Sequence, residues 1–271
     1  MLLLFEQYLP RFSGDIVPST NTGIALALAD RLDSLAGIFS IGQQPSGSRD
    51  PFALRRASLG VLRIMLERNI DLDLADLLAL SIANLNLKKE AKITPQELQK
   101  QVLTYVLDRF ISMYKEKGLA TEVFASVAAL GLSNPLDIDA RVEAVNGFTL
   151  LPEAAALAAA NKRVSNILAK QSDAKIPAKP SENLFEDDAE SQLATQIADL
   201  QKTIAPLLKE RNYYAVLEKL AGLREPVDQF FDNVMVMTDN IEVRNNRLAL
   251  LQGLQQLFIN VADISQLAAV K

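Results

Sequence analysis

Residues 29–66 read ADRLDSLAGIFSIGQQPSGSRDPFALRRASLGVLRIML, and this stretch decides the fold because it holds two helical patterns joined by a turn. Around the first pattern, apolar residues recur at helical spacing, at Leu28, Leu32, Leu35 and Phe39. Asp30 and Asp33 lie one turn apart on another face. The turn that follows is rich in glycine, serine and proline. The pattern therefore predicts an amphipathic helix with an acidic edge, a turn and a second helix.

The second helix is predicted to run from Pro51 to Arg68. Asp50 can serve as its N-cap and Pro51 as its first helical residue. Three arginines lie outside the apolar stripe of this helix, at Arg55, Arg56 and Arg63. Residues 53–68 hold four arginines and one glutamate, so this helix can bind phosphate. The alternative is a solvated helix face whose arginines pair with carboxylates such as Glu67.

The composition favours helices throughout the chain of 271 residues. The chain is 49% hydrophobic and 23% charged, which is enough apolar material for one large core or two ordinary ones. Leu and Ala dominate and glycine is scarce, whereas a sheet protein would need more β-branched residues and turn glycines. We therefore expect an all-α protein.

Two residue types are missing, and their absence excludes several kinds of chemistry. Without cysteine the chain has no disulfide and no thiolate metal site. Without histidine it has no His-based acid–base catalysis, no Ser-His triad and no histidine metal ligand. No glycine-rich phosphate loop of standard spacing is present either. Only carboxylates, lysines and tyrosines remain for catalysis.

The net charge of −5 argues against a uniformly basic nucleic-acid surface. Basic and acidic side chains balance over residues 1–170, and the acidic excess lies in residues 171–271. Any RNA binding is therefore expected to be local. The apolar start lacks a basic region, and no stretch approaches the roughly 20 apolar residues that span a bilayer. We expect a cytoplasmic protein without a membrane partner.

Further helices follow along the chain. Thr94 and Glu97 have the spacing of a capping box, which predicts the start of a long helix that stops near Gly118. Pro206 lies inside a later helical pattern and is expected to kink or end that helix. Four apolar side chains near residue 233 are predicted to fill a bundle interior: Phe230, Phe231, Met235 and Met237.

The chain resembles a known family in three blocks that follow the family order. Residues 37–66 are similar to the β subunit of the bacterial, two-subunit type of glycyl-tRNA synthetase, where an HD-like domain joins the domains that follow. Residues 151–170, LPEAAALAAANKRVSNILAK, form a second block. Residues 223–267 resemble the C-terminal anticodon-binding domain of the same subunit, a helical domain of the DALR type shared with arginyl-tRNA synthetase.

The resemblance implies a domain organisation. Residues 1–92 would be the end of an HD-like helical domain, and residues 93–271 a helical-bundle anticodon-binding domain with a flexible loop at 171–186. The sequence LADRLD resembles the last element of an HD domain, and Asp30 occupies the position of that element's aspartate. Since the early HD helices are missing, we expect a C-terminal fragment. Without histidine the usual HD metal site cannot assemble, so Asp30 and Asp33 are expected to cap helices or pair with arginine.

Two further groups of polar residues are candidates for tRNA contact beside the arginine helix. The first lies in the alanine-rich block and consists of Lys162, Arg163 and Asn166. The second consists of Arg244, Asn245 and Arg247. Guanidinium and amide groups of this kind read unstacked RNA bases. The alternative is structural: the asparagines bond neighbouring helices, and Asn246 and Arg247 brace the acidic segment 228–242.

The resemblance implies a function for the whole enzyme. Its two subunits attach glycine to tRNA(Gly) with ATP, and the α subunit holds the ATP and Mg²⁺. This chain would position tRNA(Gly) beside the α subunit, with no catalytic residue, cofactor or metal of its own. Two alternatives are a helical scaffold that serves subunit contact alone and an HD-type metal-dependent phosphohydrolase, which the absence of histidine opposes.

Overall fold

The computed structural model describes residues 5–47, 49–85, 93–171 and 173–268. Within these residues the regular structure is helical, and the β-type pairing is an isolated bridge between Ser46 and Arg49. The expectation of an all-α protein is confirmed. No helix in these ranges has both the length and the apolar character needed to cross a membrane.

The chain divides into two compact units. The first comprises residues 1–119 with 132–139, and the second comprises residues 120–131 with 140–271. The sequence had suggested a boundary after residue 92, whereas the contacts assign the helices between residues 95 and 116 to the first unit.

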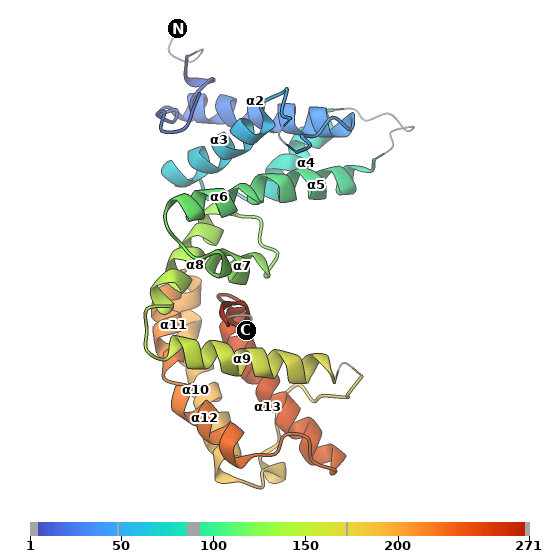
Figure 1. Ribbon diagram of the computed structural model, residues 1–271, viewed down its shortest axis with the longest axis vertical. Helices are drawn as coiled ribbons and strands as arrows, with labels where there is room; N and C mark the ends of the chain where they lie inside the picture. Colours follow the sequence, from blue (N-terminus) through green and yellow to red (C-terminus); the bar gives the residue numbers. More distant parts are fainter. Residues whose placement is uncertain (1–4, 48, 86–92, 172, 269–271) are drawn as a thin grey trace. The chain divides into compact units, whose positions relative to one another are not determined.

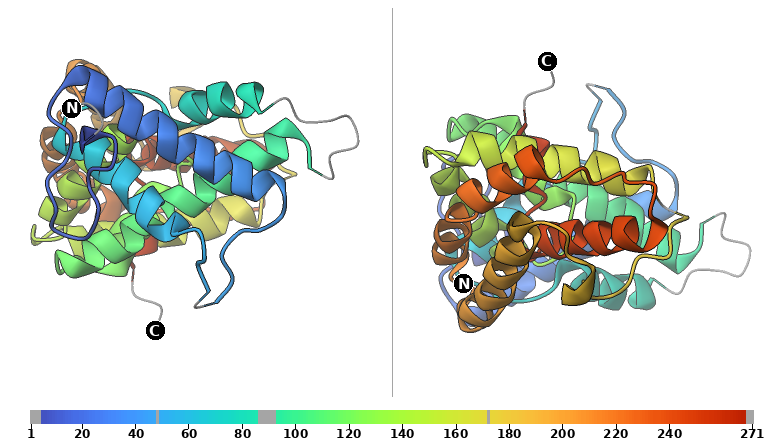
Figure 2. Two further views of the ribbon diagram at one scale, coloured as in Figure 1. Left: turned by 90° about the horizontal axis from the view of Figure 1, so that it is seen from above. Right: turned by 90° about the horizontal axis from the view of Figure 1, so that it is seen from below.

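The first unit includes helices α2 to α6, and α2 contacts α3, α4 and α5 (Figure 1; Figure 2, left). Their bounds are α2 Asn21–Ser40, α3 Leu54–Glu67, α4 Leu74–Asn84, α5 Pro95–Leu107 and α6 Arg109–Glu116. The predicted apolar stripe of α2 is buried, with Leu35 and Phe39 in its last two turns.

The arginine helix α3 begins three residues later than the sequence predicted. Pro51 and Phe52 lie in a turn, and the N-cap is Ala53 in the left-handed conformation, with φ 55°. Asp50 still satisfies the exposed donors of the helix, because its carboxylate accepts from the backbone N–H groups of Leu54 and Arg55 at 2.8 and 3.0 Å. Asp50 therefore caps α3 as predicted, although it lies outside the helix. The prediction that Pro51 is the first helical residue was wrong.

The capping box of α5 is confirmed. Thr94 accepts from the backbone N–H of Glu97, and the Glu97 carboxylate accepts from the backbone N–H of Thr94 at 3.0 Å. The single long helix predicted after it is divided at Asp108 into α5 and α6.

A buried arginine organises the start of the first unit. Arg31 of α2 is 8% exposed, and its guanidinium donates to four carbonyl groups, of Gln7, Tyr8, Pro10 and Ala27, at 2.8–3.2 Å. The Arg31 side chain also runs along α3 at Gly60. A Cβ atom at Gly60 would lie 2.6 Å from Arg31 Nε, so only glycine allows this approach.

A buried carboxylate supports the N-terminus of α2. Glu6 accepts from the backbone N–H groups of Ser19 and Thr20 and from both of their hydroxyl groups. Thr20 in turn caps α2 by accepting from the N–H of Gly23 at 3.0 Å. The hydrogen bonds from Thr20 and Ser19 lower the pKa of Glu6 from 4.5 to about 2.

The second unit is a helical bundle in which α13 contacts both α9 and α10 (Figure 2, right). Its elements are α7 Thr121–Ala128, the part of α8 (Pro135–Phe148) after Asp139, α9 Ala154–Ala169, η1 Glu182–Leu184, α10 Asp188–Lys209, α11 Tyr213–Ala221, α12 Arg224–Asn233, α13 Ile241–Ile259 and η2 Ile264–Leu267. Helix α10 continues through Pro206 to Lys209, so this proline does not end the helix.

The segment 173–187 is tied to the bundle. Asn246 of α13 accepts from the backbone N–H of Ser181 at 2.6 Å and donates to its carbonyl at 3.1 Å. These two bonds satisfy the backbone N–H and carbonyl groups of Ser181, which lies in an irregular segment. Asn246 therefore has a structural role, as one alternative predicted, but its partner is Ser181 and not the acidic segment 228–242.

The methionines after α12 are not core residues, and this prediction was wrong. Helix α12 ends at Asn233, and Val234 has extended backbone. Because side chains alternate along an extended segment, Val234 and Val236 are buried whereas Met235 and Met237 face outward. The helical spacing assumed from the sequence did not apply beyond Asn233.

We predict that Gly60→Ala destabilises the protein by roughly 1–3 kcal/mol, because the new Cβ overpacks against a guanidinium that four carbonyl groups hold in place. Gly37→Ala is the matched control, since its nearest neighbour would be the Leu85 side chain at 3.9 Å. That variant should gain about 0.5–1 kcal/mol from helix propensity. Urea unfolding measures both; equal effects would contradict the account of Gly60.

We also predict that Glu6 makes stability depend on pH. Its contribution is fully present above the unfolded pKa of 4.5 and is lost as the pH falls through the folded value of about 2. Glu6→Gln should be less stable than the parent at about pH 5.5 and should lose less stability on moving to about pH 3. Unfolding curves with the same pH dependence for both proteins would show that Glu6 is not the group concerned.

Candidate nucleic-acid interface

The arginines of α3 are divided between structural and exposed roles. Arg63 donates to Glu67 at 2.7 Å and to the Asp15 carbonyl at 2.6 Å, which ties α3 to the N-terminal segment. Arg55 is half-buried and donates to the Gly47 carbonyl. Arg56 is exposed. Of the three predicted positions, Arg56 is therefore the most accessible to a phosphate.

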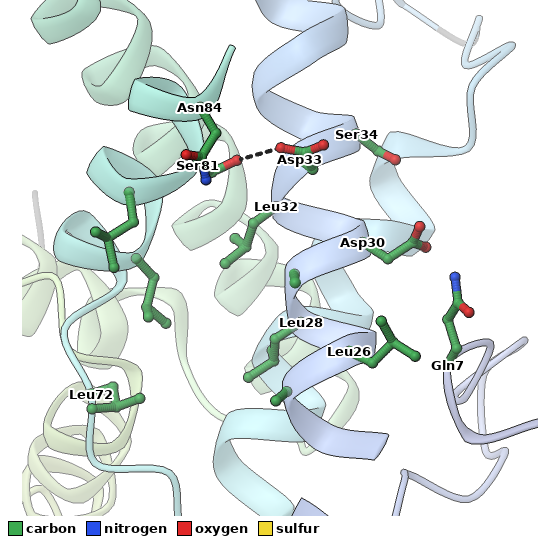
Figure 3. A pocket seen from close by; sticks show the side chains of 14 residues that line it. Gln7, Leu26, Leu28, Asp30, Leu32, Asp33, Ser34, Leu72, Ser81 and Asn84 are labelled. Carbon is green, nitrogen blue, oxygen red and sulfur yellow. Dashed lines mark hydrogen bonds between the residues drawn. The ribbon is translucent and has the colours of Figure 1, made fainter. Parts of the chain in front are cut away.

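The acidic edge of α2 lines a pocket of about 720 Å³ between α2 and α4 (Figure 3). Its wall is mostly apolar, with Leu26, Leu28, Leu32 and Leu72 among the lining residues. Asp33 accepts from the Ser81 hydroxyl at 3.2 Å, a partner on α4 that the sequence did not predict. Within the described residues, no group of three carboxylate, histidine or cysteine side chains is positioned to hold a metal.

Helix α9 presents the second predicted group to solvent. Lys162, Arg163 and Asn166 are all exposed. The guanidinium carbon of Arg163 lies 4.1 Å from the centre of the Phe231 ring. This cation–π contact joins α9 to the last turn of α12. The neighbouring Asn161 differs, since it is buried and donates to the Leu157 carbonyl of its own helix. This surface therefore combines cations, an amide and an aromatic ring.

The third predicted group does not act as one surface. Arg247 is 6% exposed, and its guanidinium is surrounded by acceptors inside the bundle. It donates to Glu190 at 2.8 and 3.2 Å, to Glu186 at 2.8 Å and to the Met235 carbonyl at 3.0 Å. Arg247 is thus held within the bundle, and we remove it from the candidate RNA contacts.

The other two members of this group are half-buried. Arg244 donates to the Thr238 carbonyl at 3.3 Å, and its Nε atom is buried without a partner. Asn245 lies beside it on α13. Both residues stay near the loop between α12 and α13, so they can contribute to its surface.

Glu190, the partner of Arg247, is fully buried and does two things at once. Its carboxylate closes the capping box of α10 by accepting from the backbone N–H groups of Glu186 and Asp187 at 2.8 and 3.1 Å. It also binds Arg247, whose pKa rises above its ordinary value chiefly because of this hydrogen bond. The Arg247–Glu190 pair therefore links the start of α10, helix α13 and the loop after α12.

Sequence reasoning missed the apolar part of this region. Phe231 is half-buried under Arg163, and three apolar side chains follow it at the surface: Met235, Met237 and Ile241. The alternating sequence Val-Met-Val-Met carried a signal for an extended segment. A helical reading of the same residues hid that signal.

The fold and this surface define a class of protein. Residues 157–271, which make up most of the second unit, match the DALR anticodon binding domain family. Residues 2–129 match the family described as glycyl-tRNA synthetase beta subunit. The chain belongs to the family of glycyl-tRNA synthetase β subunits.

Curated relatives agree over nearly the whole chain. A glycine–tRNA ligase β subunit from Marinobacter nauticus is 51% identical over 97% of this chain and 37% of its own length. Those of Pasteurella multocida and Pseudomonas aeruginosa are 50% and 51% identical, over 97% and 98% of this chain and 38% of their own length. The chain thus spans less than two fifths of these relatives, and the match lies in their C-terminal region.

We predict that Arg247→Met destabilises the protein by roughly 3–5 kcal/mol, because it leaves the Glu190 carboxylate buried without its cation. Arg244→Met is the matched control, three residues earlier on the same helix and bonded to one carbonyl. Its cost should stay below about 1.5 kcal/mol. Chemical denaturation measures the difference, and similar losses would mean that the buried pair has no special role.

Proposed function

We propose that this chain is the tRNA-binding, C-terminal part of a glycyl-tRNA synthetase β subunit, and that its second unit binds the anticodon region of tRNA(Gly). The observation that carries the proposal is the Arg163 guanidinium stacked on Phe231, with Lys162 and Asn166 exposed on the same helix. This group lies within the residues that match the DALR anticodon binding domain.

The chemistry of this surface suits a single-stranded RNA loop. Lys162 and Arg163 can neutralise phosphates, which supplies affinity and makes binding sensitive to salt. Exposed arginine planes and aromatic rings stack on unpaired bases, and an asparagine can bond their edges. Arg56 of α3 is a further phosphate contact in the first unit, with Arg55 beside it.

In the complete enzyme the proposed role is to position the tRNA. The reaction attaches glycine to tRNA(Gly) with ATP, and we place ATP and Mg²⁺ in the α subunit and no catalytic residue in this chain. Its partners are then tRNA(Gly) and the α subunit, and it acts in the cytoplasm. The helical content, the family matches and the exposed cations of α9 support this assignment.

We predict that the double variant Lys162→Glu, Arg163→Glu binds tRNA(Gly) about tenfold or more weakly. The slope of log affinity against log salt concentration should also become less steep by about 1–2, because up to two phosphate contacts are lost. Filter binding at several salt concentrations measures both quantities. Lys219→Glu on α11, also exposed in the second unit, is the matched charge control and should bind almost as the parent does.

Two results would contradict the proposal. The first is a parent protein that does not bind tRNA at any salt concentration, because the second unit would then be a scaffold for subunit contact. The second is an equal loss for the α9 variant and for Lys219→Glu, because binding would then depend on net charge and not on this surface.

A further inference from the structure

The loop between α12 and α13 exposes an unusual amount of apolar surface. Met235 is 75% exposed, Met237 45% and Ile241 61%, all within seven residues. Elsewhere a large apolar side chain of this unit is exposed singly, as Leu150 is at 81%. Single exposed apolar residues need no explanation, whereas a group of them marks a surface that a partner covers.

This exposure is built into the backbone of the loop. Val234 and Val236 are 5% and 6% exposed, so they anchor the alternate side chains and turn both methionines outward. Arg247 donates to the Met235 carbonyl at 3.0 Å, and Arg244 donates to the Thr238 carbonyl at 3.3 Å. The loop is therefore held in a form that presents Met235 and Met237.

The end of the loop is fixed as well. Asn240 caps α13 by accepting from the backbone N–H groups of Glu242 and Val243 at 3.0 and 3.4 Å. Ile241, the first residue of α13, follows this cap directly. The three apolar side chains therefore belong to a segment, residues 235–241, that hydrogen bonds hold to α13 at both ends: Arg247 bonds the Met235 carbonyl, and Asn240 caps the helix.

We infer that Met235 and Met237, with Ile241, form a platform on which unstacked bases of the bound RNA loop rest. The inference builds on the proposed function and names the residues that would touch the bases. A methionine side chain is flexible and polarizable, so it packs against flat rings of different shapes. Contact with base faces of this kind tolerates sequence and adds affinity without adding charge.

The neighbours of the platform favour RNA over an apolar protein surface as the occupant. Phe231, which the Arg163 guanidinium covers, lies four residues before Met235 along the chain, and the exposed Lys162 is next to Arg163 on α9. Arg244, at the other end of the loop, is half-buried and donates to the Thr238 carbonyl at 3.3 Å. The loop and the helix ends that flank it expose three acidic side chains, Asp232, Asp239 and Glu242, so the cations that can hold phosphates lie on α9 at the Phe231 end of the platform.

A double-mutant cycle between protein and RNA tests the inference. The protein variant is Met235→Ala, Met237→Ala, whose side chains are exposed and therefore contribute little to folding. The RNA variants are tRNA(Gly) molecules with single abasic positions in the anticodon loop. Leu150→Ala removes an apolar side chain of the same unit that is 81% exposed, and it is the control.

The double methionine variant should bind intact tRNA(Gly) about tenfold more weakly, which is roughly the combined effect of two methionine sulfurs packed against aromatic rings. Its salt dependence should equal that of the parent, since no charge is removed. At one or more loop positions an abasic site should weaken the parent and leave the methionine variant almost unchanged, which is the coupling expected of a direct contact. Leu150→Ala should behave as the parent does.

The contrary outcomes separate the inference from the proposed function. If the parent and Leu150→Ala bind tRNA(Gly), charge reversal on α9 weakens binding, and the methionine variant keeps full affinity and full sensitivity to abasic sites, the platform does not exist and the RNA surface remains. If that variant instead loses association with the synthetase α subunit, the loop is a protein contact and the inference is overturned. If the parent does not bind tRNA(Gly), both ideas fail.

Discussion

The arrangement of the second unit depends on the ion pair between Arg247 and Glu190. Two charges this far inside a bundle are costly to bury unless every donor and acceptor is used. Here Arg247 reaches Glu186, Glu190 and the Met235 carbonyl, while Glu190 also closes the capping box of α10. A single contact thus fixes the start of one helix and the loop beside another, and the surface proposed for RNA is built on that loop.

Buried and half-buried arginines elsewhere in the chain also hold irregular segments by donating hydrogen bonds to backbone carbonyl groups. Arg31 holds the N-terminal segment through the carbonyl groups of residues 7, 8 and 10, and Arg63 holds it through the Asp15 carbonyl. Arg141 donates to the carbonyl groups of Asn260 and Val261 in the second unit. The guanidinium fork suits this role because it offers several donors in one plane. These irregular segments therefore take their shape from side chains of the neighbouring helices.

This role of arginine explains what the sequence could and could not reveal. Helical spacing, capping residues and composition were sufficient for the all-α fold and the Thr94 capping box, because these depend on local physics. A structural role for Arg247 in bracing segment 228–242 was one of the two alternatives from the sequence, and its bond to the Met235 carbonyl agrees with that alternative. Its main partner could not be predicted, because Glu190 lies fifty-seven positions away along the chain. For the same reason, three arginines that were equal candidates in the sequence differ in the structure. Arg56 is exposed, Arg163 is stacked on Phe231, and Arg247 is buried.

The central claim is that α9 and the loop after α12 form the RNA-binding surface, and photo-crosslinking tests it directly. Ultraviolet crosslinking of tRNA(Gly) to the intact chain, followed by mass spectrometry of the crosslinked peptides, identifies the protein segments that touch RNA. Our account predicts crosslinks at residues 162–166 and 231–241, carried by nucleotides of the anticodon loop. Crosslinks confined to other helices of either unit, with both of these segments unmodified, would contradict it.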